Sequence, residues 1–513
     1  MQGLRTASMF LLLFVLSAIA SWGEPGRLLT VDALLPPSED LDGDDLFRTI
    51  TAAVQATASG ELLRVAPGRY DRALGEQFPI VIDKDLIIEA SGGPAETVID
   101  AGGAPGAIEI RRGSVALRGF TIEGASGPRA AGVTITGNVR SVKIIGNVVQ
   151  DIATTADSYS FGIRIYQVET GLVEVIDNIV LHVAGNGISV GHSSAVVEVR
   201  ENIVRQIGRA MIDDVEYSVG IAINSSTGVA VEGNDVSQAA LGISLMSSSG
   251  CLVRKNIVRD NLQQEPISHV LLTLAGLEID TPGEGILLAF GSHGNAILEN
   301  EIEGNGTGIG LYLADENRIE SNSIRNNKAT TMTWQRETAH GLGIAIDYSY
   351  RNQIFGNTVE GNGDVGLVLK NAALNLVSDN LITDHSDSGI LLVEGSGEAV
   401  NSIARNKIRG AAGAGITIKG GYSEIKRNEI TANGVGIKIM ETAEAKGHTL
   451  QENNIFANGF GLLNNGRGVV KAEENWWGDV SGPYHPQINP VGKGDQVSDQ
   501  VDFQPWRTAE VRG

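Results

Sequence analysis

The strongest constraint on the fold is a pair of short motifs that recurs between about residues 130 and 475. A Gly-Ile strand comes first, as in residues 242–245 (Gly-Ile-Ser-Leu), and an asparagine strand follows, as in residues 255–258 (Lys-Asn-Ile-Val). The pair occurs thirteen times, beginning with Gly132 and Asn147, and its shortest period is 22 residues. A fixed period of this size is typical of a solenoid, in which each unit buries its apolar face only against its neighbours.

Within a unit, β-branched residues alternate with small or polar ones, as in residues 416–419 (Ile-Thr-Ile-Lys), which is strand periodicity. Several short strands per unit, with no room for helices, predict an all-β parallel β-helix. Stacked at roughly 4.8 Å per coil, thirteen or more coils make a rod about 60 Å long. Gly and Asn fall between the strands, where tight corners need positive φ or a local side-chain bond. Equivalent asparagines are expected to stack in hydrogen-bonded ladders along the rod.

The segments outside the array are predicted to close its ends. Residues 45–130 are assigned to an N-terminal cap and the first coils, because residues 46–55 have apolar side chains at helical spacing and a strand follows. Residues 131–475 are the repeats. Residues 476–513 are assigned to a C-terminal cap and tail, in which tryptophans and prolines cover the last coil.

The chain resembles a known group of proteins in three places. These are the repeat, the amphipathic helix followed by a strand and Ala-Pro-Gly-Arg-Tyr (66–70), and the NWWGD…SGP…HP…PW ending. They are similar to the right-handed parallel β-helix proteins of the pectate-lyase-like superfamily, which includes polysaccharide lyases, glycoside hydrolases, uronate epimerases and NosD-like periplasmic proteins. The resemblance covers nearly the whole mature chain. It implies a right-handed β-helix with a helical N-terminal cap and a Trp-rich C-terminal cap, but one fold hosts many activities.

The first residues predict export. Arg5 and the apolar run 9–16 precede a small-residue cleavage site at 18–20, so residues 1–20 are predicted to be a signal peptide cleaved near Ala20. Residues 21–44 are predicted to be a polar linker. We expect a secreted or periplasmic monomer without a transmembrane segment after cleavage. The single cysteine, Cys251, excludes a disulfide framework.

The charge restricts the partners. The formal net charge is −22, which argues against nucleic acid. It also makes an anionic polysaccharide an awkward partner unless a bound cation or a local basic patch intervenes. Aromatic residues make up only 5% of the chain, which disfavours a long stacking platform for sugars.

Four connections between an asparagine strand and the next Gly-Ile strand are longer than the others. They are residues 148–161, 203–219, 257–284 and 323–342. All four fall at the same corner of the coil, so we expect them to project from one edge of the rod and overhang the outer face of the Gly-Ile strands. Loops on a rigid scaffold commonly carry function.

Polar and aromatic residues of these loops and of the strand face beneath them are the candidate site. The predicted substrate-binding residues are Arg164, Tyr166, His192, Tyr217, Tyr312, Trp334, His340 and Lys370. The predicted catalytic residues are Asp213, Asp214, Asp347, Arg209 and Arg336. Asp347 and Lys370 occupy the same place in adjacent coils, so their side chains should be neighbours.

The chemistry of these residues leaves several mechanisms open. Polysaccharide lyases of the resembling group use carboxylates to hold Ca²⁺ and a basic residue to remove a proton; Asp213, Asp214 and Glu216 could be the Ca²⁺ ligands, and Arg209 or Arg336 the base. A hydrolase would instead pair two carboxylates, such as Asp213 or Asp214 with Asp347.

Three functions follow. The first is an exported protein that binds a polysaccharide along the loop-lined face, with cleavage of the lyase or glycosidase type left open. The second is a non-catalytic envelope or surface module that binds glycan or protein. The third is a NosD-like periplasmic accessory protein. Copper handling finds little support, because the eight histidines show no close pairing in sequence.

Overall fold

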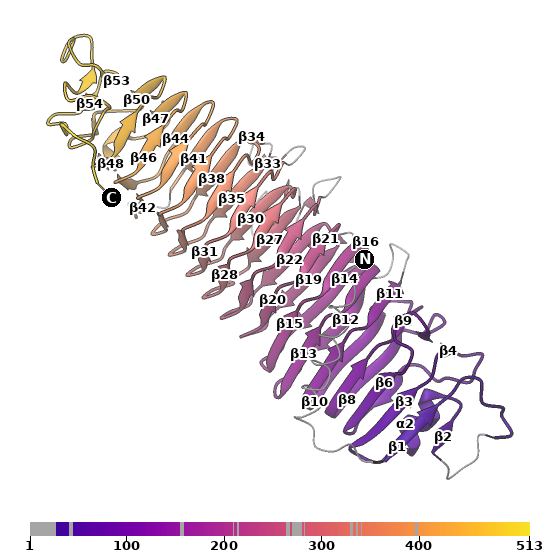
Figure 1. Ribbon diagram of the computed structural model, residues 1–513. Coiled ribbons are helices and arrows are strands. Elements are labelled where there is room, and N and C mark those ends of the chain that lie inside the picture. The colour runs from indigo at the N-terminus through magenta and orange to yellow at the C-terminus, as the bar shows by residue number, and fades with distance from the viewer. Residues whose placement is uncertain are drawn as a thin grey trace, which may run out of the picture.

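The computed structural model is a rod built of stacked coils, with the N-terminal elements at one end and the C-terminal strands at the other (Figure 1). It describes residues 27–39, 45–153, 159–208, 218–262, 283–328, 341–395 and 399–512, together with the backbone of three short hairpins between them. The fold is an all-β, right-handed parallel β-helix, as predicted.

The Gly-Ile strands form the first of three parallel ladders, and each pairs with its counterpart in the next coil. Thirteen of them lie in the described residues, in agreement with the repeat count. They are β10 (Ala131–Ile145), β12 (Ser160–Tyr166), β14 (Ile179–Gly191), β19 (Val219–Asn224), β22 (Leu241–Met246), β27 (Glu284–Ala289), β30 (Thr307–Tyr312), β35 (Leu342–Asp347), β38 (Val365–Lys370), β41 (Ser388–Val393), β44 (Ala414–Ile418), β47 (Val435–Ile439) and β50 (Phe460–Asn464).

Two further ladders complete the coils. The second contains β13 (Leu172–Ile176), β15 (Val196–Arg200), β20 (Ala230–Glu232), β23 (Leu252–Arg254), β28 (Ala296–Leu298), β31 (Arg318–Glu320), β36 (Gln353–Phe355), β39 (Leu376–Ser378), β42 (Asn401–Ala404), β45 (Ser423–Lys426), β48 (His448–Gln451) and β51 (Val470–Lys471). The third follows the asparagines and contains β11 (Val148–Ile152), the first half of β14, β16 (Ile203–Gly208), β21 (Asp235–Ser237), β24 (Ile257–Arg259), β29 (Glu301–Glu303), β32 (Ser323–Arg325), β37 (Thr358–Glu360), β40 (Leu381–Thr383), β43 (Lys407–Arg409), β46 (Glu429–Thr431) and β49 (Asn454–Phe456).

The repeated asparagines form the predicted ladder. Each donates from its side-chain nitrogen to the side-chain oxygen of its counterpart in the next coil, as Asn300 does to Asn322 at 2.9 Å and Asn322 to Asn357 at 3.0 Å. The ladder runs without a break from Asn147 to Asn475. These amides satisfy one another inside the rod, so the asparagines are scaffold rather than a site.

The glycines of the Gly-Ile strands are required for space rather than for positive φ, which we expected of glycines at the corners and which Gly233 and Gly356 have, at 67° and 65°. A Cβ at Gly285 would lie 2.6 Å from Ile302 Cγ2 and 2.8 Å from the carbonyl oxygen of Gly308 in the next coil. The positive φ at the corner belongs instead to the residue before each ladder asparagine, such as Lys255 at 56°. The glycine therefore lets neighbouring coils and the opposite wall approach closely.

At the N-terminal end, the helix is α2 (Ile50–Ala56), shorter than the predicted 46–55. Residues 46–47 form strand β2 (Leu46–Phe47) instead, because they pair in parallel with β1 (Leu28–Val31). Strand β1 lies within the segment predicted as a linker. Its side chains Leu29 and Val31 are buried, which explains why this part is a strand of the first coil rather than an extended tail.

The first coils then follow as β3 (Glu61–Val65), β4 (Gly68–Tyr70), β5 (Ile80–Ile82), β6 (Leu86–Ala90), β7 (Thr97–Asp100), β8 (Gly106–Arg118) and β9 (Thr121–Glu123). The C-terminal end contains the short 3₁₀ helix η1 (Ala445–Gly447) and β52 (Pro483–Tyr484), β53 (Gly494–Gln496) and β54 (Val501–Asp502). Trp477 and Phe503 are buried there in the same core as the coils. That these two ends act as caps stays a prediction.

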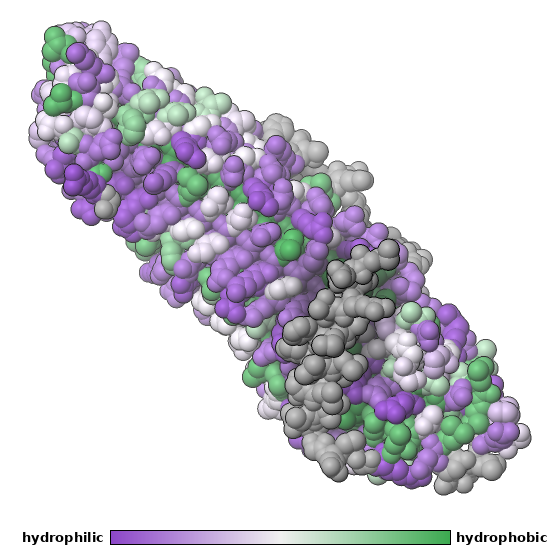
Figure 2. All heavy atoms as spheres, viewed as in Figure 1, coloured by the Kyte–Doolittle hydropathy of each residue, from purple (hydrophilic) through white to green (hydrophobic). Residues whose placement is uncertain are grey.

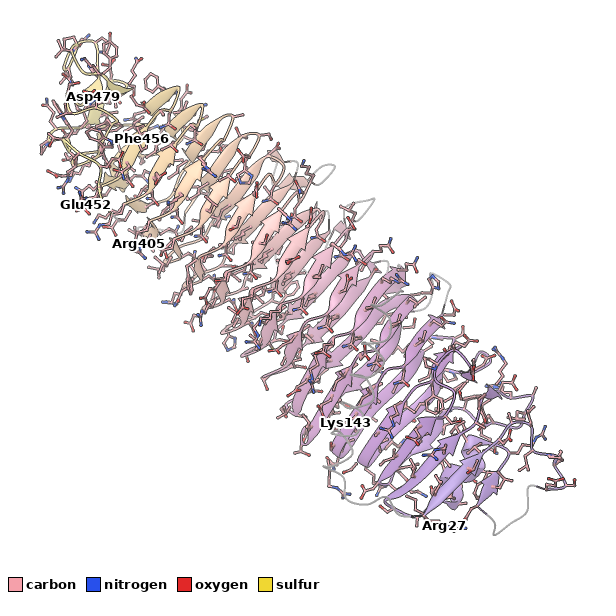
Figure 3. All side chains as sticks on the ribbon, viewed as in Figure 1. Arg27, Lys143, Arg405, Glu452, Phe456 and Asp479 are labelled. Atoms are coloured by element: carbon pink, nitrogen blue, oxygen red, sulfur yellow. The ribbon has the colours of Figure 1, made fainter. Side chains whose placement is uncertain are left out.

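Outward side chains of the second and third ladders are mainly polar, and Figure 2 shows a largely hydrophilic surface over the C-terminal half. Ion pairs join neighbouring coils, as between Lys143 and Glu174 at 2.9 Å and between Arg405 and Asp379 at 2.8 Å (Figure 3). In the described part of the chain, no helix is long and apolar enough to cross a membrane.

Candidate functional site

The candidate site is the outward side of the Gly-Ile ladder. Six predicted site residues lie on it or directly beside it: Arg164, Tyr166, His192, Tyr312, Asp347 and Lys370. The others lie outside the described residues, either completely (Arg209, Asp213, Asp214, Arg336, His340) or with their side chains (Glu216, Tyr217, Trp334). The predicted Ca²⁺ ligands, and all the predicted catalytic residues except Asp347, therefore stay predictions.

Three of the four long connections carry an antiparallel hairpin. These are β17 (Ala210–Ile212) with β18 (Val215–Tyr217), β25 (Ile267–Ser268) with β26 (Asp280–Thr281), and β33 (Met332–Trp334) with β34 (Glu337–Ala339). Strand β18 lies against β25, and β26 lies against β33. The hairpins thus form a row. That the long connections all leave one corner of the rod stays a prediction.

Four side chains of the second and third coils form what we name the arginine cluster: Phe161, Arg164, Tyr166 and His192. The guanidinium carbon of Arg164 lies 4.8 Å from the ring centre of Phe161 and 4.3 Å from that of Tyr166. The rings of Tyr166 and His192 meet edge to face, with centres 5.6 Å apart. Three residues that the sequence placed in the site are therefore in contact.

Strand register explains this assembly. Arg164 and Tyr166 point outward from β12 because they alternate with the buried Ile163 and Ile165. Tyr166 lies opposite Gly191, the last residue of β14. A Cβ at Gly191 would be only 3.3 Å from the Tyr166 ring, so this glycine leaves room for the aromatic contact with the residue that follows it.

The charge of Arg164 has no described counter-ion. Its side chain is half-buried, and burial lowers the pKa of the guanidinium, with the positive charge of Arg129 acting in the same direction. No described carboxylate forms an ion pair with it, whereas outward arginines such as Arg200 and Arg405 are paired. Because arginine stays protonated at any ordinary pH, the cluster presents a positive charge between two aromatic rings.

A buried amide borders the arginine cluster. Asn186 lies opposite Phe161 in the ladder and is 1% exposed. Its side-chain nitrogen donates to the Tyr159 hydroxyl at 2.8 Å, while its side-chain oxygen has no donor among the described atoms. Phe161 and Asn186 are not among the predicted site residues, although both precede the Gly of a Gly-Ile strand, a position that faces outward.

Further along the same face lies a second group, which we name the buried charge cluster: Glu284, Tyr312, Asp347 and Lys370. Asp347 lies directly between Tyr312 and Lys370 in the ladder, as the repeat predicted for Asp347 and Lys370. Asp347 also accepts a hydrogen bond from the Asn371 side chain at 3.3 Å. These side chains face outward from the coil, yet Tyr312 and Asp347 are fully buried and Lys370 is 4% exposed.

Tyr312 is held as a neutral phenol. Burial raises its pKa well above the ordinary value, and the negative charges of Glu284 and Asp347 act in the same direction. Its ring lies over Gly310, where a Cβ would be 2.8 Å from the ring and 3.1 Å from the hydroxyl oxygen. Gly310 therefore provides the space that this buried aromatic side chain occupies.

The surroundings of the buried charge cluster are apolar. Outward residues of the neighbouring coils form a hydrophobic cluster separate from the core of the rod: Val219, Ala222, Leu241, Leu287, Ala289, Leu342, Ala345, Val365, Val368, Leu391 and Val393. A charge in such an environment is costly unless an opposite charge lies beside it, as Lys370 does beside Asp347. With almost no exposed surface, this cluster is closed to a ligand, and the arginine cluster is the part that a ligand can reach.

Metal binding was tested on the side chains themselves. Within the described ranges, no three His, Cys, Asp or Glu residues converge as metal ligands would. Cys251 is buried, and burial raises the pKa of its thiol, which disfavours the thiolate that soft metals prefer. The described residues therefore do not fit a copper site.

His385, which lines a shallow groove beside Lys328 and Asp384, is also structural. A second, shorter asparagine ladder ends at Asn362, and His385 takes the next place in line. The ring nitrogens of His385 lie 3.1 Å and 3.2 Å from the carbonyl oxygens of Asn362 and Val359. Burial lowers the pKa of this imidazole.

Two family models match the sequence. One describes a right-handed β-helix region and covers residues 131–369. The other describes a periplasmic copper-binding protein, NosD, and covers residues 328–485. The chain is a right-handed parallel β-helix protein with NosD-like relatives. No functionally curated protein matches it.

Solved structures similar to this β-helix protein include three carbohydrate-active enzymes. One is the A-module of a mannuronan C-5 epimerase from Azotobacter vinelandii, at 12% identity, covering 76% of this chain and 91% of that one, with a TM-score of 0.37. Another is a DFA-IIIase from Arthrobacter chlorophenolicus, at 15% identity, covering 69% and 87%, with a TM-score of 0.42. The third is the catalytic unit of an α-1,3-glucanase from Streptomyces thermodiastaticus, at 16% identity, covering 77% and 66%, with a TM-score of 0.44. Similarity at this level says nothing about substrate or activity.

Proposed function

We propose that this β-helix protein is exported and binds a polysaccharide chain along the outward side of its Gly-Ile ladder, with the arginine cluster as an anchoring point. The observation that carries the proposal is the contact of Arg164, Tyr166 and His192. Aromatic rings offer apolar faces to sugar rings, and a guanidinium offers several N–H donors to their oxygens. Both kinds of group are accessible here on a rigid sheet.

The geometry of the rod supports an extended ligand. Equivalent side chains of successive coils lie about 4.8 Å apart, so a chain running along the rod can contact several coils. The hairpin row leaves the corner beside this sheet and gives such a ligand an edge to lie against. The proposal is for binding; cleavage would add a role for Asp213, Asp214, Arg209 or Arg336.

The test is a glycan panel measured with and without Ca²⁺ for binding, ultraviolet absorbance and reducing ends. We expect binding of at least one polysaccharide that Arg164→Ala or Tyr166→Ala weakens at least tenfold, while Arg205→Ala, an exposed arginine on β16, leaves it unchanged. Rising absorbance would indicate β-elimination, and new reducing ends without absorbance would indicate hydrolysis. Absence of binding throughout the panel would overturn the proposal.

A second candidate is a NosD-like periplasmic accessory role, which the NosD match at residues 328–485 favours. Its test is metal analysis of protein purified without added metal, together with a copper titration. Stoichiometric copper would support this role and would place the ligands outside the residues described above. Metal-free protein that does not bind copper would count against a copper-binding form of it.

A further inference from the structure

We infer that the arginine cluster holds a single anionic group of its glycan. The ligand is then a mainly neutral polysaccharide with isolated acidic groups, rather than a polymer charged at every sugar. This inference rests on the polysaccharide binding proposed above.

The first support is the state of Arg164. A half-buried guanidinium that no described carboxylate pairs with has lost part of its hydration without a described counter-ion in exchange, which is unfavourable. No described acidic residue compensates this charge, and the neighbouring positive charge of Arg129 disfavours it further. An anionic group on a ligand would supply the missing partner.

The second support is preorganisation. Phe161 and Tyr166 contact the guanidinium at 4.8 Å and 4.3 Å, so the long side chain is already held in one place. Binding then costs little rotamer entropy. A fixed guanidinium can bond the two oxygens of a carboxylate in parallel, which a lysine in its place could not do.

The distribution of charge along the rod restricts how many anionic groups the ligand carries. Residues 101–200, which contain Arg164, have eight acidic and eight basic residues. Residues 231–400, which form the middle of the rod, have 22 acidic and nine basic residues. A chain charged at every sugar would meet net repulsion there, whereas a mostly neutral chain with one acid at Arg164 would not.

The experiment compares three chains by calorimetry at low salt. They are gellan, in which one sugar of each repeating unit carries a carboxylate; the same gellan with its carboxylates reduced to alcohols; and polygalacturonate, charged at every sugar. We expect gellan to bind more tightly than the other two. Charge-assisted hydrogen bonds of this kind correspond to about a ten- to hundredfold difference in affinity.

Variants assign the effect to Arg164. Arg164→Gln should lower the affinity for gellan to that for the reduced chain, and should leave the affinity for the reduced chain unchanged. Arg164→Lys should have an intermediate affinity for gellan, because lysine keeps the charge but cannot form the two parallel hydrogen bonds. Arg205→Gln is the control with the same loss of charge. Thermal unfolding verifies that each variant is folded.

The outcomes separate the two proposals. Equal binding of gellan and reduced gellan, or gellan binding that Arg164→Gln does not weaken, overturns the anionic site and leaves polysaccharide binding intact. If polygalacturonate binds more tightly than gellan, the inference that the ligand is mainly neutral with isolated acidic groups is overturned. Binding of none of the three, and of no glycan of the wider panel, overturns both. Competition by glucuronate and by glucose sulfate, with glucose as control, distinguishes a carboxylate from a sulfate.

Discussion

The asparagine ladder predicts a large and local loss of stability when one member is removed. Asn322→Ala deletes an oxygen that accepts from the backbone N–H and the side-chain nitrogen of Asn300, both at 2.9 Å. It also deletes a nitrogen that donates to Ile297 at 2.8 Å and to Asn357 at 3.0 Å. Two donors of Asn300 are then left in a dry interior without an acceptor. At about 1–3 kcal/mol for each unsatisfied group, the variant should lose roughly 2–6 kcal/mol.

The assay is urea unfolding followed by circular dichroism, with Asn465→Ala as the control because Asn465 is exposed. Asn322→Asp is a second, nearly isosteric variant, which retains an acceptor for Asn300 but removes the donor to Ile297 and Asn357 and buries a charge. Both ladder variants should unfold at clearly lower urea than the control. An Asn322→Ala midpoint equal to that of Asn465→Ala would refute the reasoning, because it would mean that water or a small shift satisfies the orphaned donors.

Three more predictions follow from the same structure. Burial lowers the pKa of His448 to about 4, against 6.5 in the unfolded chain. The unfolded chain therefore binds more protons between these pH values, so the free energy of unfolding should fall by about 3 kcal/mol as the pH drops from 6.5 to 4. In His448→Asn this part of the pH dependence should be missing. Gly389→Ala places a Cβ 2.6 Å from Ile408 and 2.7 Å from the Gly415 carbonyl, so it should destabilise more than Gly208→Ala, where the nearest atom to a Cβ is the Val183 carbonyl oxygen at 3.7 Å; equal midpoints would argue against the close-approach explanation. Lys370→Met leaves the carboxylate of Asp347 buried without its opposite charge and should cost about 3–5 kcal/mol, which the double variant with Asp347→Leu should largely recover in thermal unfolding.

Much of the fold could be predicted because the same pair of motifs, a Gly-Ile strand and an asparagine strand, recurs in every unit. An asparagine recurs at a similar distance after the Gly-Ile strand in every unit, so the ladder and the thirteen Gly-Ile strands followed from spacing alone. The role of the glycines did not, since a close approach between coils depends on side chains from other units, such as Ile302 beside Gly285. The same is true of β1, whose pairing with β2 and β3 is visible only once the first coil has closed.

The candidate site was predicted in part. Alternation along a strand correctly placed Arg164 and Tyr166 on one face, and the coil period placed Asp347 beside Lys370. Burial could not be predicted, because the exposure of an outward residue depends on what packs over the sheet. Asp347 and Tyr312 therefore point the predicted way but are buried, whereas Arg164 is accessible. Phe161 could have been predicted as part of the site if the residue before each Gly-Ile pair had been recognised as an outward position.

Because the asparagine ladder is unbroken, the rod can be lengthened one coil at a time. Because every coil offers the next one the same amide acceptor, duplicating residues 235–256, a unit of one shortest period, would insert a coil that its neighbours accept without new contacts. Such an insertion would move the arginine cluster and the buried charge cluster apart by about 4.8 Å and change neither of them. Coil number thus becomes an adjustable variable: the distance between the two clusters can be set in steps, independently of the chemistry of either one.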